Sequence, residues 1–343
     1  MRGSIETVAG KTPRVESKLN FRDRSGGYKV RWGIGRMRYK VDPGLYALGA
    51  PDEDSPILVS ANFKMSFDRL REALAGRNAW LLVLDTNGIN VWCAAGKGTF
   101  ATRELAARVE SSMLAQLVRH RRIIVPQLGA PGISAHEVQK LSGFKVVYGP
   151  VRAEDLPDFM DAGMKAGPGM RTKTFTTGER LALVPVEIVH AFKTFLMATP
   201  LVFLLCGFSS RLWVLSDALR LGGFTALGIL MAIAAGCLLT PLLLPWLPGR
   251  AFSLKGVWPG IACAVLFLML RRSFGALPAP GALEAVAWML LIPAISAYLA
   301  MNFTGCSTFT SLSGVKKEMK WAVPAQAAAA VLGTVFWIAA LFV

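Results

Sequence analysis

The sequence predicts a doubly wound α/β domain followed by an all-α bundle of about five transmembrane helices. In the first half, short apolar runs alternate with helical patterns, and in the second half long apolar stretches follow one another. The composition agrees, because 53% of the 343 residues are hydrophobic and 17% are charged. Such a composition excludes a disordered chain and does not fit an ordinary soluble enzyme.

The N-terminal residues 1–40 form a basic arm with 11 basic and 3 acidic residues. A charge excess of this kind suits anionic lipid, nucleic acid or an acidic partner. Because the same chain carries membrane spans, we expect membrane lipid and no nucleic acid. Residues from Lys29 to Tyr39 alternate in polarity, which predicts an edge strand at the end of the arm.

Residues 41–168 carry the pattern of the α/β domain. Four short apolar runs are typical of buried parallel strands and lie at 57–60, 80–84, 123–126 and 145–148. Helical patterns separate them, with apolar positions at Phe67, Leu70 and Leu74, at Leu105, Val109, Met113 and Leu117, and within 154–164. Strands and helices alternating at this spacing predict right-handed crossovers and a Rossmann-like sheet.

A linker, residues 169–188, leads into a transmembrane domain at 189–343. Its predicted spans are about 189–208, 223–247, 256–270, 283–303 and 322–343. The third is marginal in length, since only about fifteen apolar residues separate Lys255 from Arg271. The N-terminus shows no signal-peptide pattern, so we expect the α/β domain in the cytoplasm and the bundle in the inner membrane. Span interiors almost without ionisable residues favour an anchor or docking bundle over an ion-coupled transporter.

Ligands of doubly wound sheets bind beyond the carboxyl ends of the strands. The residues that follow the four predicted strands are small, polar or glycine, as a ligand-facing rim would be. These candidates are Ser60, Asn62, Asp85, Thr86, Gln127, Gly129, Tyr148 and Gly149. Ordinary turns use the same residue types, so a purely structural role stays equally open.

The segment from Asn90 to Lys97 is the strongest chemical motif. Glycines at 88, 96 and 98 remove bulk, so that a large ligand can approach the backbone. Cys93 and Lys97 are four residues apart on one helix face, and a helix N-terminus and an ammonium both favour a thiolate, which is a soft metal ligand. A phosphate loop is excluded, because Val91 and Gly98 replace the glycine and Ser/Thr that it requires. A buried structural cysteine and a ligand offered to a cofactor both remain open.

The five cysteines stand alone, at positions 93, 206, 237, 263 and 306. No CxxC spacing occurs, which excludes a zinc ribbon and a disulfide scaffold and predicts no iron–sulfur cluster in this chain. Any reducing electrons must therefore come from another protein.

The run from Asn90 to Lys97 resembles the cap-helix signature of the mercury-methylating corrinoid proteins. That membrane-bound family is related to the large subunit of the corrinoid iron–sulfur protein, and the resemblance extends to the predicted architecture. It implies a cobalamin-type corrinoid with Cys93 as lower axial ligand of its cobalt. The helix covering the corrin would consist of Asn90, Val91, Trp92, Cys93, Ala94, Ala95, Gly96 and Lys97. Unlike the large subunit, this chain has neither an N-terminal four-cysteine motif nor room for a further barrel domain.

The resemblance also implies an activity, the transfer of a cobalt-bound methyl group to Hg(II) to form methylmercury. The implied partners are a ferredoxin-like protein with two four-iron clusters and a methyl-tetrahydrofolate-dependent methyl donor system. Histidine ligation of cobalt uses a D-x-H-x-x-G motif, which is absent around His120, His136 and His190. Two alternatives stay open: a corrinoid methyl carrier for another acceptor, of the acetyl-CoA-pathway type, and a non-catalytic membrane scaffold that binds a ligand.

Overall fold

The computed structural model describes residues 3–209, 212–273, 279–306 and 312–342. The chain divides into two compact units. The first, here the α/β unit, comprises Met1–Val30 and Ile34–Lys173, and the second, here the helical unit, comprises Arg31–Gly33 and Thr174–Val343. Each unit has its own apolar core.

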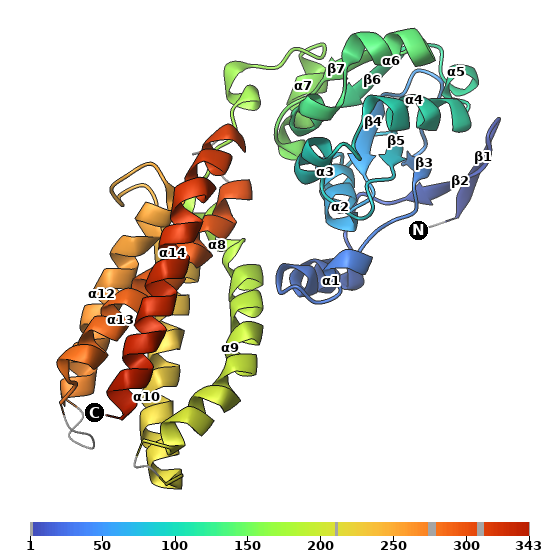
Figure 1. The fold of residues 1–343 in the computed structure, drawn as a ribbon. Helices are drawn as coiled ribbons and strands as arrows, with labels where there is room; N and C mark the ends of the chain where they lie inside the picture. The colour runs from blue at the N-terminus through green and yellow to red at the C-terminus, as the bar shows by residue number, and fades with distance from the viewer. Residues whose placement is uncertain (1–2, 210–211, 274–278, 307–311, 343) are drawn as a thin grey trace. The chain divides into compact units, whose positions relative to one another are not determined.

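The α/β unit is built on one seven-stranded sheet in the order β1-β2-β3-β5-β4-β6-β7 (Figure 1). The strands are β1 (Ser4–Thr7), β2 (Gly10–Val15), β3 (Gly44–Leu48), β4 (Ile57–Ala61), β5 (Ala79–Leu84), β6 (Arg122–Val125) and β7 (Lys145–Tyr148). The four predicted strands are confirmed as β4 to β7, and they pair in parallel. Every residue of β4 and β5 is buried, which explains their unbroken apolar character.

The sheet as a whole is mixed, because the segments ahead of β4 also join it. Strand β3 runs antiparallel to β5, β2 runs parallel to β3, and β1 pairs antiparallel with β2. None of these three strands, β1, β2 and β3, was predicted from the sequence.

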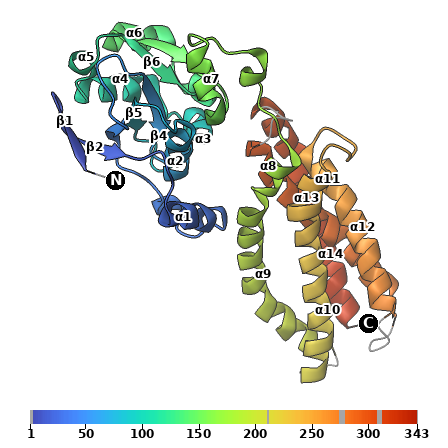
Figure 2. The same cartoon turned by 180° about the vertical axis from the view of Figure 1, so that it is seen from behind.

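Helices cover both faces of the sheet, as a doubly wound fold requires (Figures 1 and 2). On one face, α2 (Lys64–Ala73) and α7 (Leu156–Asp161) contribute Phe67, Leu70, Leu156 and Phe159 to the core. The other face carries residues of α3 (Val91–Lys97), α4 (Thr102–Ser111), α5 (Leu114–Leu117) and α6 (Ala135–Ser142). The predicted second helix is thus split into α4 and α5, and the break falls at Met113, whose φ is +49°.

The predicted strand from Lys29 to Tyr39 is wrong. This region contains the end of α1 (Phe21–Arg31) and a 3-10 turn at Arg36–Arg38. Asn20 and Asp23 start the helix by a reciprocal cap: the Asp23 N–H donates to Asn20 Oδ1 (2.9 Å), and the Asn20 N–H donates to Asp23 Oδ2 (3.1 Å). Positive φ angles at Gly33 and Gly35 end it. These helix-start and helix-end signals decide the local structure, although the polarity of the residues alternates as in a strand.

The helical unit contains five helical segments long and apolar enough to cross a membrane, by length and composition. They are Thr177–Gly207, Leu215–Leu243, Phe252–Ser273, Ala282–Gly305 and Ser313–Leu341. The individual helices are α8 (Thr177–Leu181), α9 (Val184–Gly207), α10 (Leu215–Ile233), α11 (Thr240–Leu243), α12 (Phe252–Ser273), α13 (Ala282–Met301) and α14 (Leu312–Leu341), with a π-helical turn at Ala234–Leu239 (Figure 2).

The marginal third span is a full helix, α12, because its terminal charges have partners. Near its start, Lys255 Nζ donates to the carbonyls of Leu244 (2.6 Å) and Leu247 (2.7 Å). Near its end, Arg271 Nε donates to Glu284 Oε1 of α13 (3.1 Å). The short apolar run therefore lies inside a longer helix, whose Lys255 is hydrogen-bonded to backbone carbonyls and whose Arg271 is paired with a carboxylate.

Candidate functional site

The strand order places a crevice at one point of the α/β unit. From β4 the chain crosses to β5 on one side and then returns to β6 on the other side of β4. The connections leave β4 and β6 in opposite directions, and ligands bind at such switch points, beyond the carboxyl ends of the strands. A cleft of about 360 Å³ opens there, lined by residues that include Ser60, Phe63, Asn90, Pro126 and Val151.

The lining of this cleft comes from five segments. They are the end of β4, the start of α2, the start of α3, the residues after β6 and the residues after β7. Most of the lining side chains are apolar, and the polar exceptions are Ser60, Ser66, Arg69 and Asn90. An apolar hollow with a few polar groups suits a large ligand that has a broad apolar face and a polar periphery.

Asn62 joins two of the predicted rim segments. It is buried directly after β4, and its Nδ2 donates to Asp85 Oδ1 (3.0 Å). Its Oδ1 accepts from the backbone N–H groups of Thr86 (3.2 Å) and Gly88 (2.9 Å), and lies 2.8 Å from the Thr86 hydroxyl. Asn62, Asp85 and Thr86 thus fix the loop that carries α3, and they stand behind the cleft instead of lining it.

Helix α3 begins and ends at well-defined caps. Asn90 is its N-cap and accepts a hydrogen bond from the Cys93 N–H (2.9 Å), while Gly98 ends it in the left-handed conformation with φ +77°. Asn90, Val91 and Trp92 line the cleft. Cys93 follows one residue later and is half-buried.

The predicted motif divides into two faces of α3. Ala94 and Ala95 are buried in the core of the unit, and therefore do not offer their methyl groups to a ligand. Trp92, Gly96 and Lys97 are exposed, and their helical spacing puts them on the same side as Cys93. A methyl group added at Gly96 would meet no atom within 4 Å. This outer face of α3, defined by Trp92, Cys93, Gly96 and Lys97, is the part of the motif that is open to a ligand.

The remaining predicted residues brace the same edge of the sheet. Gln127 accepts from Arg171, and the Tyr148 hydroxyl donates to the Ile133 carbonyl (2.6 Å). A Cβ at Gly129 would collide with the ring of Phe100, and one at Gly149 would lie 3.0 Å from Ile124. Their roles in this structure are hydrogen bonding and packing within the loops.

Sequence reasoning missed much of the cleft wall. Phe63, Met65, Ser66 and Arg69 come from the start of α2, and a further group follows β7, namely Pro150, Val151, Ala153 and Leu156. Only the strand order reveals them, because it shows that β4 and β6 are neighbours and that α2 begins beside their junction. Within the described residues, no three His, Cys, Asp or Glu side chains form a group that could hold a metal ion.

The fold defines a class of protein: an α/β unit with a cleft at the switch point of its sheet, joined to a helical unit with five candidate membrane spans. Comparison with known families narrows the class. Residues 35–160, which include the cleft and α3, match the family model described as CO dehydrogenase/acetyl-CoA synthase delta subunit.

Individual relatives agree with this match. The gamma subunit of the acetyl-CoA decarbonylase/synthase complex from Methanopyrus kandleri is 32% identical over 128 residues, 37% of this chain and 27% of the relative. The corrinoid/iron-sulfur protein large subunit of Moorella thermoacetica is 29% identical over 127 residues, 36% of this chain and 28% of the relative. The chain thus spans little more than a quarter of the length of the relatives it matches.

Proposed function

We propose that this chain is a membrane-anchored corrinoid protein whose α/β unit binds a cobalamin-type cofactor at the switch-point cleft. One observation supports this most strongly: the cleft and the motif helix α3 lie at the same edge of the sheet. The similarity to the corrinoid/iron-sulfur protein large subunit of Moorella thermoacetica, which covers 36% of this chain, supports the choice of cofactor.

The residues present fit such a cofactor. The cleft offers apolar walls and few polar groups, and Gly96 leaves open space on the outer face of α3. Cys93 presents a single sulfur from the first turn of that helix. When bound, the corrinoid supplies a cobalt centre that carries a methyl group. We propose that the Cys93 sulfur would hold that cobalt, and that the outer face of α3 would lie against the corrinoid.

The chain's own residues then have defined tasks. Asn90 holds the Cys93 N–H, and therefore fixes the turn from which the sulfur projects. Lys97 lies one helical turn further on the same face and is exposed beside the proposed cofactor position. The Trp92 indole lines the cleft and is 48% exposed, so it offers an apolar surface to a ligand. A thiolate donates more electron density to a metal than imidazole or water does, and axial ligands tune reactivity in this way.

For the acceptor we propose Hg(II), which receives the methyl group together with its bonding electron pair and forms methylmercury. The resemblance of residues Asn90 to Lys97 to the mercury-methylating family supports this choice. We place the chain in the cytoplasmic membrane, anchored by the five candidate spans. Restoring the carrier requires two electrons and a new methyl cation equivalent. A ferredoxin-like protein with two four-iron clusters and a methyl-tetrahydrofolate-dependent system have the required chemistry.

The test is an anaerobic methyl-transfer assay with the full chain in detergent, loaded with methylcobalamin. We expect single-turnover formation of methylmercury from Hg(II), and loss of that product in the Cys93→Ala variant. Cys306→Ala is the matched control, since it also removes one thiol. If the protein loaded with methylcobalamin leaves Hg(II) unmethylated, the proposal that Hg(II) is the methyl acceptor is wrong.

A second candidate follows from the relatives, which are named as subunits of acetyl-CoA decarbonylase/synthase complexes. In that case the chain is a corrinoid methyl carrier for another acceptor. The same loaded protein would then be inert toward Hg(II) but would pass its methyl group to an acetyl-CoA-forming enzyme added in its place.

A further inference from the structure

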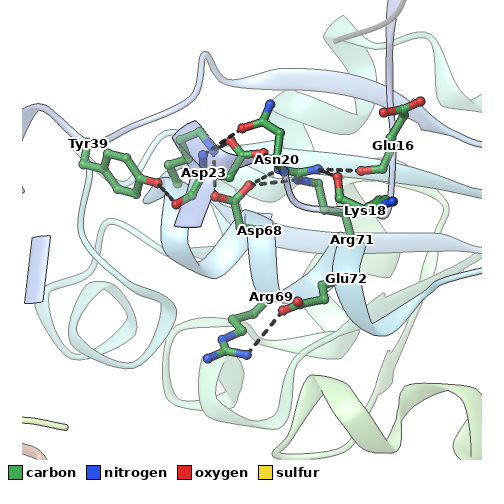
Figure 3. A network of polar contacts seen from close by, with 10 residues as sticks. Glu16, Lys18, Asn20, Asp23, Tyr39, Asp68, Arg69, Arg71 and Glu72 are labelled. Carbon is green, nitrogen blue, oxygen red and sulfur yellow. Dashed lines mark hydrogen bonds and ion pairs between the residues drawn. The ribbon is translucent and has the colours of Figure 1, made fainter. Parts of the chain in front are cut away.

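Helix α1 has one face committed to the α/β unit. Asp23, on that face, accepts from Lys64 Nζ (2.5 Å) and Arg71 Nη2 (2.7 Å) of α2. Figure 3 shows Asp23, Asp68 and Arg71 converging. Asp68 pairs with Arg71 and also with Lys64. Val30, seven residues after Asp23 and hence on the same face, is 1% exposed. The ion-pair network thus holds the helix on the α/β unit.

The opposite face of α1 carries exposed aromatic side chains. Phe21 is 84% exposed, Tyr28 69% and Trp32 50%. The spacing of seven residues places Phe21 and Tyr28 in one stripe along the helix, and Trp32 follows directly after the last helical residue. Two further exposed apolar side chains, Ile34 and Met37, follow in the turn after it. Exposing these apolar side chains to water is unfavourable. A stripe of exposed aromatic and apolar groups therefore marks an interaction surface.

Basic residues flank the aromatic stripe. Between residues 21 and 40 there are seven basic residues and one acidic residue, Asp23, which is already paired. The basic residues are Arg22, Arg24, Lys29, Arg31, Arg36, Arg38 and Lys40. In the helix, Arg22 and Lys29 lie on one side of the stripe and Arg24 and Arg31 on the other, as the 3.6-residue period requires.

We propose that residues 21–40 lie in the headgroup layer of an anionic bilayer. Aromatic rings and long aliphatic side chains partition into that layer, and flanking Arg and Lys side chains pair with anionic lipid headgroups. The net charge of +6 supplies the complementarity, and the candidate membrane spans in the same chain supply the bilayer itself. Each basic residue near such a surface strengthens the association by about fivefold.

The test uses the full chain in vesicles of phosphatidylcholine with or without phosphatidylglycerol. Part of the phosphatidylcholine carries bromine on the upper acyl chain, and the fluorescence of Trp32 is obtained as the difference between the parent and Trp32→Phe. We expect bromine quenching of the Trp32 signal in vesicles that contain phosphatidylglycerol, and much less in vesicles of phosphatidylcholine alone. Trp92, taken from the Trp92→Phe difference, serves as the reference for an exposed indole outside the segment.

Removing positive charges from the segment tests whether it binds anionic lipid or only lies near the bilayer. The triple variant Arg22→Gln, Arg24→Gln, Lys29→Gln should lower the equilibrium constant for surface association by about two orders of magnitude at low salt, and the quenching should fall accordingly. The matched control, Arg103→Gln, Lys140→Gln, Lys145→Gln, removes three exposed charges elsewhere on the unit and should leave quenching unchanged. Trp32 unquenched in both lipids overturns the proposal. Emission that responds to an added oligonucleotide or acidic protein, and not to bromolipid, assigns the segment to that partner instead.

Discussion

At the residue scale, two asparagines organise the site. The buried side-chain amide of Asn62 forms hydrogen bonds with four polar groups of the loop after β5. Asn90 begins α3 and holds the backbone of the proposed cobalt ligand. Both residues could be singled out from the sequence by type and position. Their actual task, fixing the loop rather than touching a ligand in the case of Asn62, depends on hydrogen bonds that the sequence does not reveal.

Replacing Asn90 by alanine removes the N-cap of α3. We expect a loss of about 1 kcal/mol in the free energy of unfolding, because the Cys93 N–H loses its acceptor. Asn90→Asp retains an acceptor and is the matched control. Denaturant unfolding of both variants measures the effect, and equal stability of parent and Asn90→Ala would show that the cap contributes nothing.

The carboxylate of Asp23 makes the α/β unit sensitive to acid. Burial raises the pKa of Asp23, but hydrogen bonds from Lys64, Arg71 and the Asn20 N–H, together with the charge of Lys64, outweigh burial and bring it to about 2. Its folded pKa is below the unfolded value of 3.8, so its stabilisation is complete above about pH 4 and is lost as the pH falls through 2.

Asp23→Asn should therefore cost about 2 kcal/mol at neutral pH and flatten the fall in stability between pH 4 and pH 2. The control is Asp161→Asn, which removes the exposed partner of Arg77 and should change stability little. Thermal unfolding across this pH range distinguishes the two. A parent-like acid profile in Asp23→Asn would contradict the assignment.

At the scale of elements, the sequence correctly predicted the strands and helices whose apolar residues recur in a clear pattern. The strands β4 to β7 and the five long apolar helices are confirmed. The segment from Lys29 to Tyr39 was misread because the caps at Asn20 and Asp23 and the glycines at 33 and 35 decide its structure. The cleft wall from α2 was missed because it depends on which strands are neighbours, a long-range property.

A substitution at Gly96 distinguishes the effect of α3 on stability from its proposed effect on ligand binding. Gly96→Ala adds a methyl group in open space inside a helix, so the free energy of unfolding should rise by about 0.5–1 kcal/mol. If the outer face of α3 contacts a corrinoid, the same methyl group should weaken its binding. Denaturant unfolding and a corrinoid titration followed by absorbance measure both. Unchanged affinity would show that the corrinoid does not contact this face at Gly96.

At the scale of the whole molecule, the chain combines an α/β unit, which we propose binds a corrinoid, with a helical unit of candidate membrane spans. The division after Lys173 predicts that a fragment of residues 1–173 unfolds cooperatively and binds corrinoid as the full chain does. Calorimetry and absorbance titration of the fragment test this. A folded fragment without affinity, alongside a full chain that binds, would mean that the helical unit completes the site.

Coordination of cobalt by Cys93 is the central claim, and an anaerobic visible spectrum tests it most directly. The full chain in detergent is loaded with methylcobalamin, and the parent is compared with Cys93→Ala and with Cys306→Ala. We predict a bound spectrum with the cofactor's own base displaced, altered in Cys93→Ala and unchanged in Cys306→Ala. Tight binding with identical spectra in all three proteins would contradict thiolate ligation.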